Sequence, residues 1–369
     1  MPTIALVAGE ASGDVHAANL LRALRRRCPG LRAWAVGGDA LARAGAEIVF
    51  SSDRLSALGL TEVMGRLPEV LRARRQVVER FRRSPPECFV PVDFGGLNLS
   101  LAAAARARGV PVTYYIPPKV WAWGRWRVRR LRRVADRALV VLPFEEAFFR
   151  AHGVPATYVG SPVLDHLQPR RRAPEPDVVG LLPGSRPGEV RRIWPPLRDA
   201  ACLLARDRPL RFLVPRAPAV PEALLGEASR AAGLDVTVLD GRAQEVMERA
   251  RLCLVASGTA TLECALLGTP MVIVYRVSRL TWAVGRLLVQ VPFVGLPNLI
   301  AGREVVPERV QASPRAVAGA AAALLEDGPA RNAALDGLAE VRRILGAPGA
   351  SERAAREILE HLAGTPPCD

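Results

Sequence analysis

The sequence is almost without lysine, poor in histidine and free of long hydrophobic runs. Lys119 is the one lysine among 51 Lys and Arg residues, so arginine carries nearly all of the positive charge. The four histidines form no cluster and no two of the six cysteines are spaced as Cys-x-x-Cys, which excludes the usual zinc motifs and is typical of reduced thiols in the cytosol. No stretch reaches the roughly 18–20 uninterrupted apolar residues of a spanning helix. The apolar run at 3–8 stops at Gly9 and follows no basic segment, unlike a signal peptide. We expect a chain that does not span a membrane, although it could lie on one.

The net charge of +15 is distributed unevenly along the chain. Residues 1–165 carry 25 basic and 14 acidic side chains, whereas the remaining 204 residues have a surplus of only 4 positive charges. Arginine suits phosphate recognition, so the first half favours an anionic partner: a phosphorylated small molecule, nucleic acid or an anionic membrane surface. A genome composition that replaces lysine by arginine explains the arginine content equally well.

Short apolar runs alternate with longer helical patterns, which predicts βαβ units and parallel sheets. Strands are predicted at 3–8, 31–36, 88–92, 111–116, 137–142, 177–182, 210–214, 235–239, 251–256 and 270–274. Helices are predicted at 14–27, 68–83, 97–108, 189–206, 243–250 and 258–267, and 314–363 is helical with a break at Gly346 and Pro348.

The length of 369 residues suits about two domains, and the Pro- and charge-rich stretch 166–176 is typical of a linker between them. We predict an α/β fold with two Rossmann-like, doubly wound parallel-sheet domains facing a cleft. Their ranges are 1–166 and 175–345, followed by a helical tail over 346–369.

Ligands bind at the carboxyl ends of the strands in such sheets, so the residues after each strand are the candidates. In the second half, residues 182–186 (LPGSR) place a turn, a hydroxyl and the Arg186 guanidinium at a helix start, where a diphosphate would fit. Ser257, Gly258 and Thr259 open another helix, and Glu263, one turn further on, could accept hydrogen bonds from two ribose hydroxyls. The alternatives are a solvated arginine and a capped core helix with a surface glutamate. Together the two motifs predict a nucleotide-binding second domain.

In the first half, the candidates are less specific. Glu10 and Ser12 follow the first strand in GEASGD, which is neither a Walker loop nor a dinucleotide fingerprint and could be a tight strand–helix turn. Asp93 ends the strand at 88–92, with Asn98 five residues later. Such a carboxylate could be a general base, and an Asx turn explains it equally well.

Two further segments point to a surface partner. Residues 114–133 hold three of the six tryptophans within six residues and six arginines within nine. This pattern suits single-stranded nucleic acid, a lipid headgroup layer or a solvated basic helix face. Residues 55–71 are apolar and contain glycine, and are either an amphipathic membrane contact or a core helix.

Taken in order, the motifs GEASGD, VWAW with its trailing arginines, LPFE, LLPGSR, ASGTATLE and LPNLIAGRE resemble the lipid-A-disaccharide synthase family from about residue 3 to residue 310. The resemblance implies a GT-B glycosyltransferase fold with the donor nucleotide in the second domain. It also implies a reaction that joins UDP-2,3-diacylglucosamine to 2,3-diacylglucosamine 1-phosphate, giving a β-1,6 disaccharide and UDP. The expected place is peripheral, on the cytoplasmic face of the membrane, with no cofactor, no metal and no nucleic acid, and with oligomers possible.

The resemblance also assigns roles to residues. Asp93 would deprotonate the acceptor 6-hydroxyl, with Glu10 on the neighbouring strand end as the competing candidate for the base. Glu10, Ser12 and Asn98 would line the acceptor side of the cleft. Arg186 would hold the diphosphate, which Ser257, Gly258 and Thr259 would cradle, while Glu263 would read the ribose. Asn298 would complete the donor pocket.

Three positions on the acceptor side depart from the family pattern. The family usually has an Asp-Pro-Asp-Phe run before the asparagine that matches Asn98, and here residues 93–97, which include Gly96, stand in its place. Pro117 stands where a serine is common, and Ser161 stands where the family has a histidine. A divergent UDP-sugar transferase with another lipid or sugar acceptor is therefore the alternative. A GT-B epimerase would need a catalytic histidine that the four available histidines support poorly, and a basic nucleic-acid module would leave LLPGSR and ASGTATLE unexplained.

Overall fold

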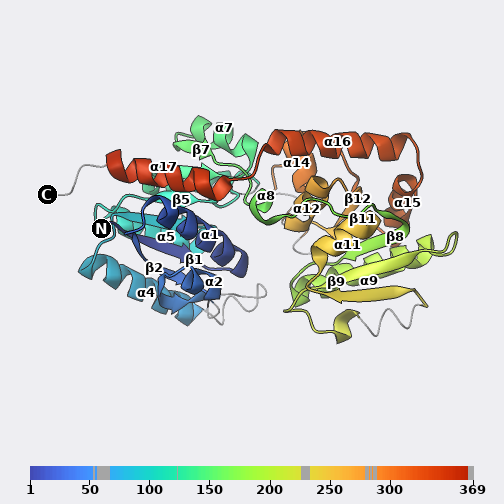
Figure 1. Ribbon diagram of the computed structural model, residues 1–369, viewed down its shortest axis with the longest axis horizontal. Coiled ribbons are helices and arrows are strands. Elements are labelled where there is room, and N and C mark those ends of the chain that lie inside the picture. The colour runs from blue at the N-terminus through green and yellow to red at the C-terminus, as the bar shows by residue number, and fades with distance from the viewer. Residues whose placement is uncertain are drawn as a thin grey trace. The chain divides into compact units, whose positions relative to one another are not determined.

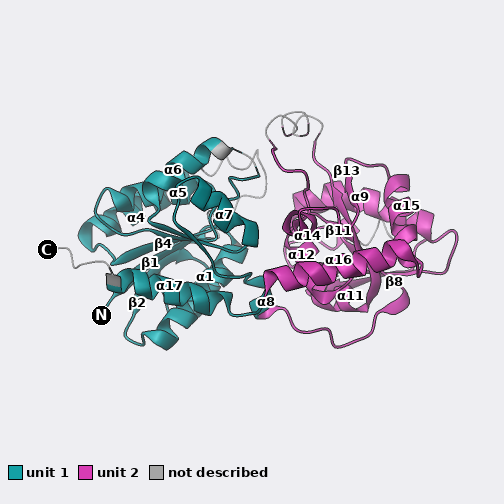
Figure 2. Cartoon of the chain, turned by 90° about the horizontal axis from the view of Figure 1, so that it is seen from above, with its two compact units in different colours: residues 1–165, 347–369 teal, residues 166–346 magenta. Residues whose placement is uncertain are grey.

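The computed structural model describes residues 1–52, 55, 67–122, 124–225, 233–278, 282, 285 and 289–364. The chain divides into two compact units, of which unit 1 comprises Met1–Asp165 and Ala347–Asp369, and unit 2 comprises His166–Gly346 (Figure 2). The segment expected as a separate tail over 346–369 thus belongs almost entirely to unit 1.

Unit 1 is built on a seven-stranded parallel sheet in the order β3-β2-β1-β4-β5-β6-β7. Its strands are β1 (Thr3–Ala8), β2 (Arg32–Gly37), β3 (Glu47–Ser51), β4 (Cys88–Val92), β5 (Thr113–Tyr115), β6 (Arg137–Val140) and β7 (Ala156–Tyr158). The chain winds outward from β1 in one direction and from β4 in the other. The switch point of the topology, where ligands bind in such sheets, therefore lies between β1 and β4.

Helices cover both faces of this sheet (Figure 1). They are α1 (Ala11–Arg27), α2 (Asp39–Arg43), α4 (Leu67–Arg83), α5 (Gly95–Arg106), the 3-10 turn η2 (Arg125–Arg127), α6 (Val128–Val134), α7 (Pro143–Ala151), α8 (Val163–His166) and α17 (Ala350–Gly364). Alternate residues of β1 show the two layers, because Ala5 and Val7 join the core beneath α4 to α7, whereas Leu6 joins the core beneath α1, α2 and α17. Burial on both faces explains why β1 is apolar from residue 4 to residue 8.

The helix α17 returns to unit 1 and packs along α1, as Figure 1 shows. Asp165 caps its start, accepting hydrogen bonds from the backbone N–H of Gly349 at 2.6 Å and of Ser351 at 3.0 Å. Further along α17, the Glu357 carboxylate pairs with Arg137 at 2.8 Å. Ala354, Ala355 and Ile358 are completely buried against α1 and the sheet. The helix is thus an integral layer of unit 1.

Unit 2 repeats the same plan with six parallel strands in the order β10-β9-β8-β11-β12-β13. The strands are β8 (Glu175–Leu182), β9 (Arg211–Arg216), β10 (Val236–Asp240), β11 (Ala250–Ala256), β12 (Met271–Tyr275) and β13 (Glu308–Val310). The helices are α9 (Pro187–Leu204), α11 (Ala243–Arg249), α12 (Thr259–Leu267), α14 (Leu296–Ala301), α15 (Pro314–Leu325) and α16 (Pro329–Leu345). Here the switch point lies between β8 and β11.

The predicted two-sheet α/β fold is confirmed, and every predicted strand overlaps an observed one. The short strands β3, β7 and β13 were not predicted. Most of the predicted 55–71 segment, residues 56–66, lies outside the described residues.

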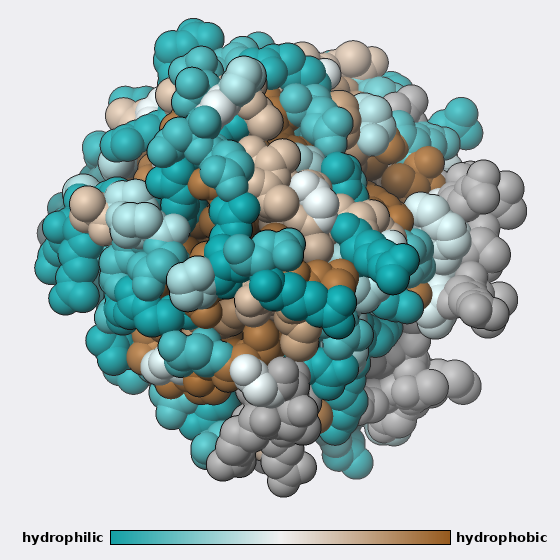
Figure 3. All heavy atoms as spheres, turned by 90° about the vertical axis from the view of Figure 1, so that its right-hand side faces the viewer, coloured by the Kyte–Doolittle hydropathy of each residue, from teal (hydrophilic) through white to brown (hydrophobic). Residues whose placement is uncertain are grey.

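The sequence also made predictions about membrane-spanning segments and cysteines. No helix in the described part of the chain is long and apolar enough to cross a membrane, and the cysteines described there are free. Seen from the α15 side of unit 2, the surface is mostly hydrophilic, with hydrophobic residues in separate patches (Figure 3).

Candidate functional site

The switch point of unit 2 opens into a pocket of about 360 Å³. Residues from the loop after β8, the end of β9 and the first turns of α11 and α12 line it. The N-termini of two helices, α9 and α12, adjoin this pocket through Gly184, Ser185, Gly258 and Thr259. Backbone N–H groups at a helix start carry no partner within the helix, and the helix dipole favours negative charge there. The pocket is thus suited to an anionic group such as a diphosphate.

The first of these helix starts is shaped by Gly184 and Glu189. Gly184 has a φ of 111°, and a side chain there would collide with the Glu189 carboxylate. That carboxylate accepts a hydrogen bond of 3.2 Å from the backbone N–H of Ser185, and burial raises the pKa of Glu189. Arg186 is the N-cap residue of α9; its side chain is exposed and is not among those that line the pocket. The glycine is required here by both the backbone conformation and the lack of space.

The second helix start, that of α12, carries Glu263, the residue predicted to bind the ribose. The Ser257 hydroxyl donates a 2.8 Å hydrogen bond to the carbonyl of Val294, which fixes the loop, and Gly258 is the N-cap of α12. Glu263 lines the same pocket, and burial raises the pKa of its carboxyl, with His166 opposing this by its charge. Ser257, Gly258, Thr259 and Glu263 are therefore brought together, as the sequence predicts.

Asn298 lies elsewhere. Its side chain is completely buried, and its amide donates to the Val306 carbonyl and the Glu308 carboxylate at 2.8 Å each. Its oxygen accepts from the backbone N–H groups of Val305 at 2.8 Å and Val306 at 3.0 Å. Glu308 in turn accepts from Gly295 N–H at 2.9 Å. With its amide fully engaged, Asn298 is placed to hold the loop around α14, and it is not among the described residues that line the pocket.

The switch point of unit 1 brings Glu10 and Asp93 to neighbouring strand ends. Ala8 and Val92 are paired in the sheet, so the loops that follow them start side by side. Gly9 lies directly beneath the Phe94 ring, which a larger residue at position 9 would displace. Glu10 is the N-cap residue of α1, and Ser12 lies exposed in its first turn. The two candidate carboxylates thus belong to one edge of the sheet.

The turn at Asp93 is strained and pinned by hydrogen bonds. Asp93 and Phe94 have φ values of 50° and 46°, a left-handed conformation that is costly without glycine. The Asp93 carbonyl accepts hydrogen bonds from the buried Asn98 amide at 2.9 Å and from the Tyr114 hydroxyl at 3.1 Å. Burial, with the nearby Asp93 charge, raises the pKa of Tyr114 and keeps it a neutral donor. Asn98, predicted to lie on the acceptor side, therefore holds the backbone of the candidate base.

One residue near this turn was not anticipated. The Arg127 guanidinium approaches the start of α5, where Nη2 would lie 3.2 Å from a side-chain carbon placed on Gly95. A cation at a helix N-terminus opposes the helix dipole, so this position is unusual unless an anion is also present. The run of arginines in 125–133 signalled a basic helix face, but not that one member turns toward the Asp93 turn.

A buried hydrogen bond connects the VWAW motif to the LPFE motif. The Trp121 indole N–H donates a 2.8 Å hydrogen bond to Glu145, which also accepts from the backbone N–H of Leu142 at 3.0 Å. Both side chains are buried, and burial raises the pKa of Glu145. Trp126 is instead 74% exposed. Of the predicted aromatic–basic surface, Trp121 is therefore internal and Trp126 external, and Trp123 lies outside the described residues.

Comparison with known proteins is consistent with this arrangement. The family model described as lipid-A-disaccharide synthetase matches residues 4–346. A lipid-A-disaccharide synthase of Myxococcus xanthus (strain DK1622) is 43% identical over 380 residues, which cover 98% of each chain. One from Anaeromyxobacter dehalogenans (strain 2CP-C) is 42% identical over 370 residues, 96% of each.

Among solved structures, the glycotransferase of kitacinnamycin superposes with a TM-score of 0.66 at 20% identity and covers 98% of this chain and 100% of its own. The calicheamicin glycosyltransferase CalG4 gives 0.66 at 18% identity over 100% of both chains. At these identities the two structures show the GT-B fold alone. On the family model and the curated relatives, the chain belongs to the lipid-A-disaccharide synthetase family.

Proposed function

We propose that this chain is a glycosyltransferase that makes the lipid A disaccharide. It would transfer 2,3-diacylglucosamine from UDP to the 6-hydroxyl of 2,3-diacylglucosamine 1-phosphate, giving the β-1,6 disaccharide 1-phosphate and UDP. The observation that carries the proposal is the pair of strand-end sites: an anion pocket at the switch point of unit 2 and a pinned carboxylate turn at that of unit 1. Family membership supplies the substrates.

The pocket of unit 2 is assigned to the UDP group of the donor. The N–H groups at the start of α12, around Gly258 and Thr259, would hold the diphosphate, beside the start of α9. Arg186, at the mouth of α9, would swing toward it and offset the negative charge that develops on UDP as it leaves. Glu263, already in the pocket, would accept hydrogen bonds from the ribose hydroxyls.

The carboxylate turn of unit 1 is assigned to the acceptor. Asp93 would take the proton of the 6-hydroxyl as its oxygen attacks the anomeric carbon, and the bond from that carbon to the diphosphate oxygen breaks with its electron pair leaving on UDP. This single displacement inverts the anomeric centre. The hydrogen bonds from Asn98 and Tyr114 to the Asp93 backbone would fix the position of the base. Glu10 and Ser12 would line the acceptor side.

The substrates carry acyl chains, which supports peripheral association with an anionic membrane surface, on the cytoplasmic face where UDP-sugars are made. Nucleic acid is not an expected partner, and an oligomer is compatible with the proposal.

The acceptor is the part of the proposal most open to variation. Gly96 is exposed, and a side-chain carbon there would meet nothing within 4 Å. Gly96 leaves space where the family usually has a larger residue. This space supports the second candidate function, a UDP-sugar transferase that uses another lipid or sugar acceptor.

Mass spectrometry of the products separates these functions. The purified chain is incubated with UDP-2,3-diacylglucosamine and, in separate reactions, with the 1-phosphate acceptor, its dephosphorylated form and an unrelated acylated sugar. We expect the disaccharide 1-phosphate and UDP in the first reaction. Product from another acceptor alone would favour the second candidate, and UDP without any disaccharide would contradict both.

A further inference from the structure

Unit 1 carries a large basic hollow that the transfer reaction does not use. It lies between α6 and the end of α7, encloses about 1050 Å³ and is lined by Arg129, Arg132, Arg133, Arg150 and Trp126, among others. We refer to it as the arginine basin. Figure 2 labels both helices in unit 1. The Asp93 turn is not among its lining residues, so the basin is separate from the proposed acceptor site.

One wall of the basin is held in place by the protein itself. The Arg150 guanidinium donates to the Ala156 carbonyl at 2.8 Å and pairs with Glu146 at 2.6 Å. Arg132 crosses over Gly153, whose φ is 73°, so closely that a side-chain carbon there would lie 3.3 Å from Nε. The glycine therefore makes room for the arginine, which is positioned rather than left to extend freely.

Three arginines of the basin, all on α6, have no partner among the residues that the structure describes. Within the described part of the chain, Arg129, Arg132 and Arg133 make no ion pair or hydrogen bond to another side chain or to the backbone, and all three are exposed. Like charges held on a single short helix repel each other, and an anion bound among them would relieve that repulsion.

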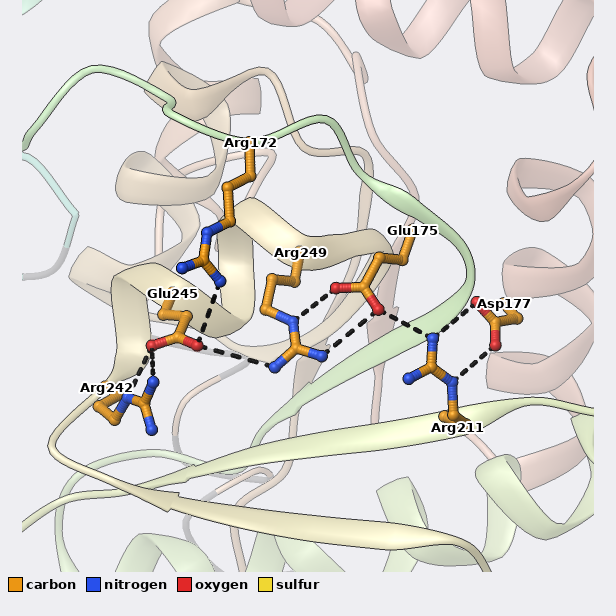
Figure 4. Close-up of polar contacts among 7 residues, drawn as sticks. All are labelled: Arg172, Glu175, Asp177, Arg211, Arg242, Glu245 and Arg249. Carbon is orange, nitrogen blue, oxygen red and sulfur yellow. Dashed lines mark hydrogen bonds and ion pairs between the residues drawn. The ribbon is translucent and has the colours of Figure 1, made fainter.

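Elsewhere in this molecule, clustered arginines are neutralised by carboxylates. Figure 4 shows such a cluster in unit 2, where Arg211 pairs with Asp177 at 2.7 Å and with Glu175 at 2.8 Å, and Arg249 pairs with Glu175 at 2.6 Å. An arginine-rich composition therefore does not by itself leave guanidinium groups unpaired. The absence of partners in the described surroundings of the basin points to a ligand.

Trp126 indicates where that ligand resides. Its side chain lines the basin and is 74% exposed, which is costly for an indole in water but favourable at the boundary between lipid headgroups and water. A small soluble anion could use the indole N–H of this tryptophan but not its apolar rings. Guanidinium groups beside an exposed indole suit phosphates at a membrane surface.

We propose that the arginine basin binds the phosphate groups of anionic phospholipid headgroups, and that its three guanidinium groups without a described protein partner favour a headgroup with two phosphates over one with a single phosphate. Each phosphate can accept bidentate hydrogen bonds from arginine, so three such arginines exceed the need of one phosphate. The basin would act as a discrete headgroup site in addition to any diffuse attraction. It rests on the membrane association proposed above, but not on the transfer reaction.

Vesicle sedimentation tests the proposal with a matched pair of variants. Arg130 lies on the same helix, is exposed and does not line the basin, so Arg130→Gln removes the same charge as Arg132→Gln. Phosphatidylcholine vesicles contain either diphosphatidylglycerol or phosphatidylglycerol at equal phosphate content. Wild type should prefer diphosphatidylglycerol, and Arg132→Gln should weaken that binding about fivefold, since one basic residue near an anionic surface contributes ~1 kcal/mol. Arg130→Gln should weaken it less than twofold.

Three outcomes would overturn the proposal. Equal losses for both variants would mean diffuse charge attraction without a site. Equal binding to the two lipids would rule out a two-phosphate headgroup as the ligand of the basin. Displacement of the protein from vesicles by soluble glycerol phosphate at the same phosphate concentration would mean that the basin takes free phosphate rather than a membrane lipid. UDP binding by each variant serves as the folding control, and transfer activity is measured separately, so its absence in wild type would count against the proposed function alone.

Discussion

Apart from the additional edge strand β7 of unit 1, the two units share one strand order and use it differently. At the switch point of unit 1 stand two carboxylates and a strained turn, whereas at that of unit 2 stand small residues and helix starts around a pocket. Their arginines differ as well, because Arg129, Arg132 and Arg133 of the basin have no partner in the described surroundings, while Arg211 and Arg249 are held by carboxylates. The same fold thus suits a base in one unit and an anion pocket in the other, and arginine content assigns no function until its pairing is known.

The largest effect should come from unit 1. Asp93→Asn keeps the shape of the side chain but cannot accept a proton, and a positioned general base typically contributes ~10²–10⁴-fold to the rate. We expect transfer to fall by about two orders of magnitude or more, with UDP affinity unchanged by calorimetry, because the pocket lies in unit 2.

Glu10→Gln is the matched comparison, since Glu10 follows the neighbouring strand. If Glu10→Gln abolishes turnover and Asp93→Asn retains it, the base is Glu10. Loss of UDP binding in Asp93→Asn would contradict the assignment of UDP binding to unit 2 and of proton transfer to unit 1.

The next effect should come from unit 2. Arg186→Ala removes a charge-assisted donor to the diphosphate, which contributes roughly 1.5–3 kcal/mol, so UDP affinity should fall at least about tenfold. Arg211→Gln, which removes an equal charge from the paired cluster of the same unit, should leave UDP affinity unchanged. Equal losses in the two variants would show that the field of the unit, and not a contact, holds UDP.

A smaller effect should appear as a pH dependence. Burial raises the pKa of Glu263, so on acidification this carboxylate takes up its proton at a higher pH than an ordinary glutamate does. The protonated form is a poorer acceptor for ribose hydroxyls, so UDP affinity should decline by roughly threefold as the pH falls through that raised pKa. Glu263→Gln should lack this decline. A decline of the same size in both proteins would assign it to the phosphates of UDP instead.

The smallest effect should be on stability alone. Arg211→Gln breaks exposed ion pairs with Glu175 and Asp177, whose carboxyl pKa values Arg211 helps to lower. Exposed pairs contribute little, so we expect Tm to fall by only ~1–3 °C, and less at high salt. Loss of vesicle binding or transfer in this variant would mean that the paired cluster has a function we have not assigned.

The sequence was sufficient for the fold and for most of the residues that meet at the pocket of unit 2. Alternating apolar runs gave two parallel sheets, and small residues after β8 and β11 pointed to Gly184, Ser185, Gly258 and Thr259. Both signals are local, because a strand of a buried sheet and a helix start each have a short pattern.

Other features could not be read from local patterns. Asn98 and Asn298 look like site residues, yet the Asn98 amide nitrogen donates to backbone carbonyls and the Asn298 amide is engaged by backbone groups and a carboxylate. A sequence does not tell such a buried amide from one that faces a ligand. No local pattern predicts that Glu189 lines the pocket, because its position there depends on the backbone conformation of Gly184. The strands β3, β7 and β13 are only five, three and three residues long, so any periodicity in them is weak.

The return of α17 to unit 1 has a consequence for the order of folding during synthesis. Unit 1 is assembled from two stretches of chain, with all of unit 2 between them. On the ribosome, domains fold as their residues emerge. Residues 1–165 must therefore wait with one face of their sheet partly uncovered, beside α1, until residues 350–364 have been made. Unit 2, although it comes later in the chain, is the first that can reach its complete fold.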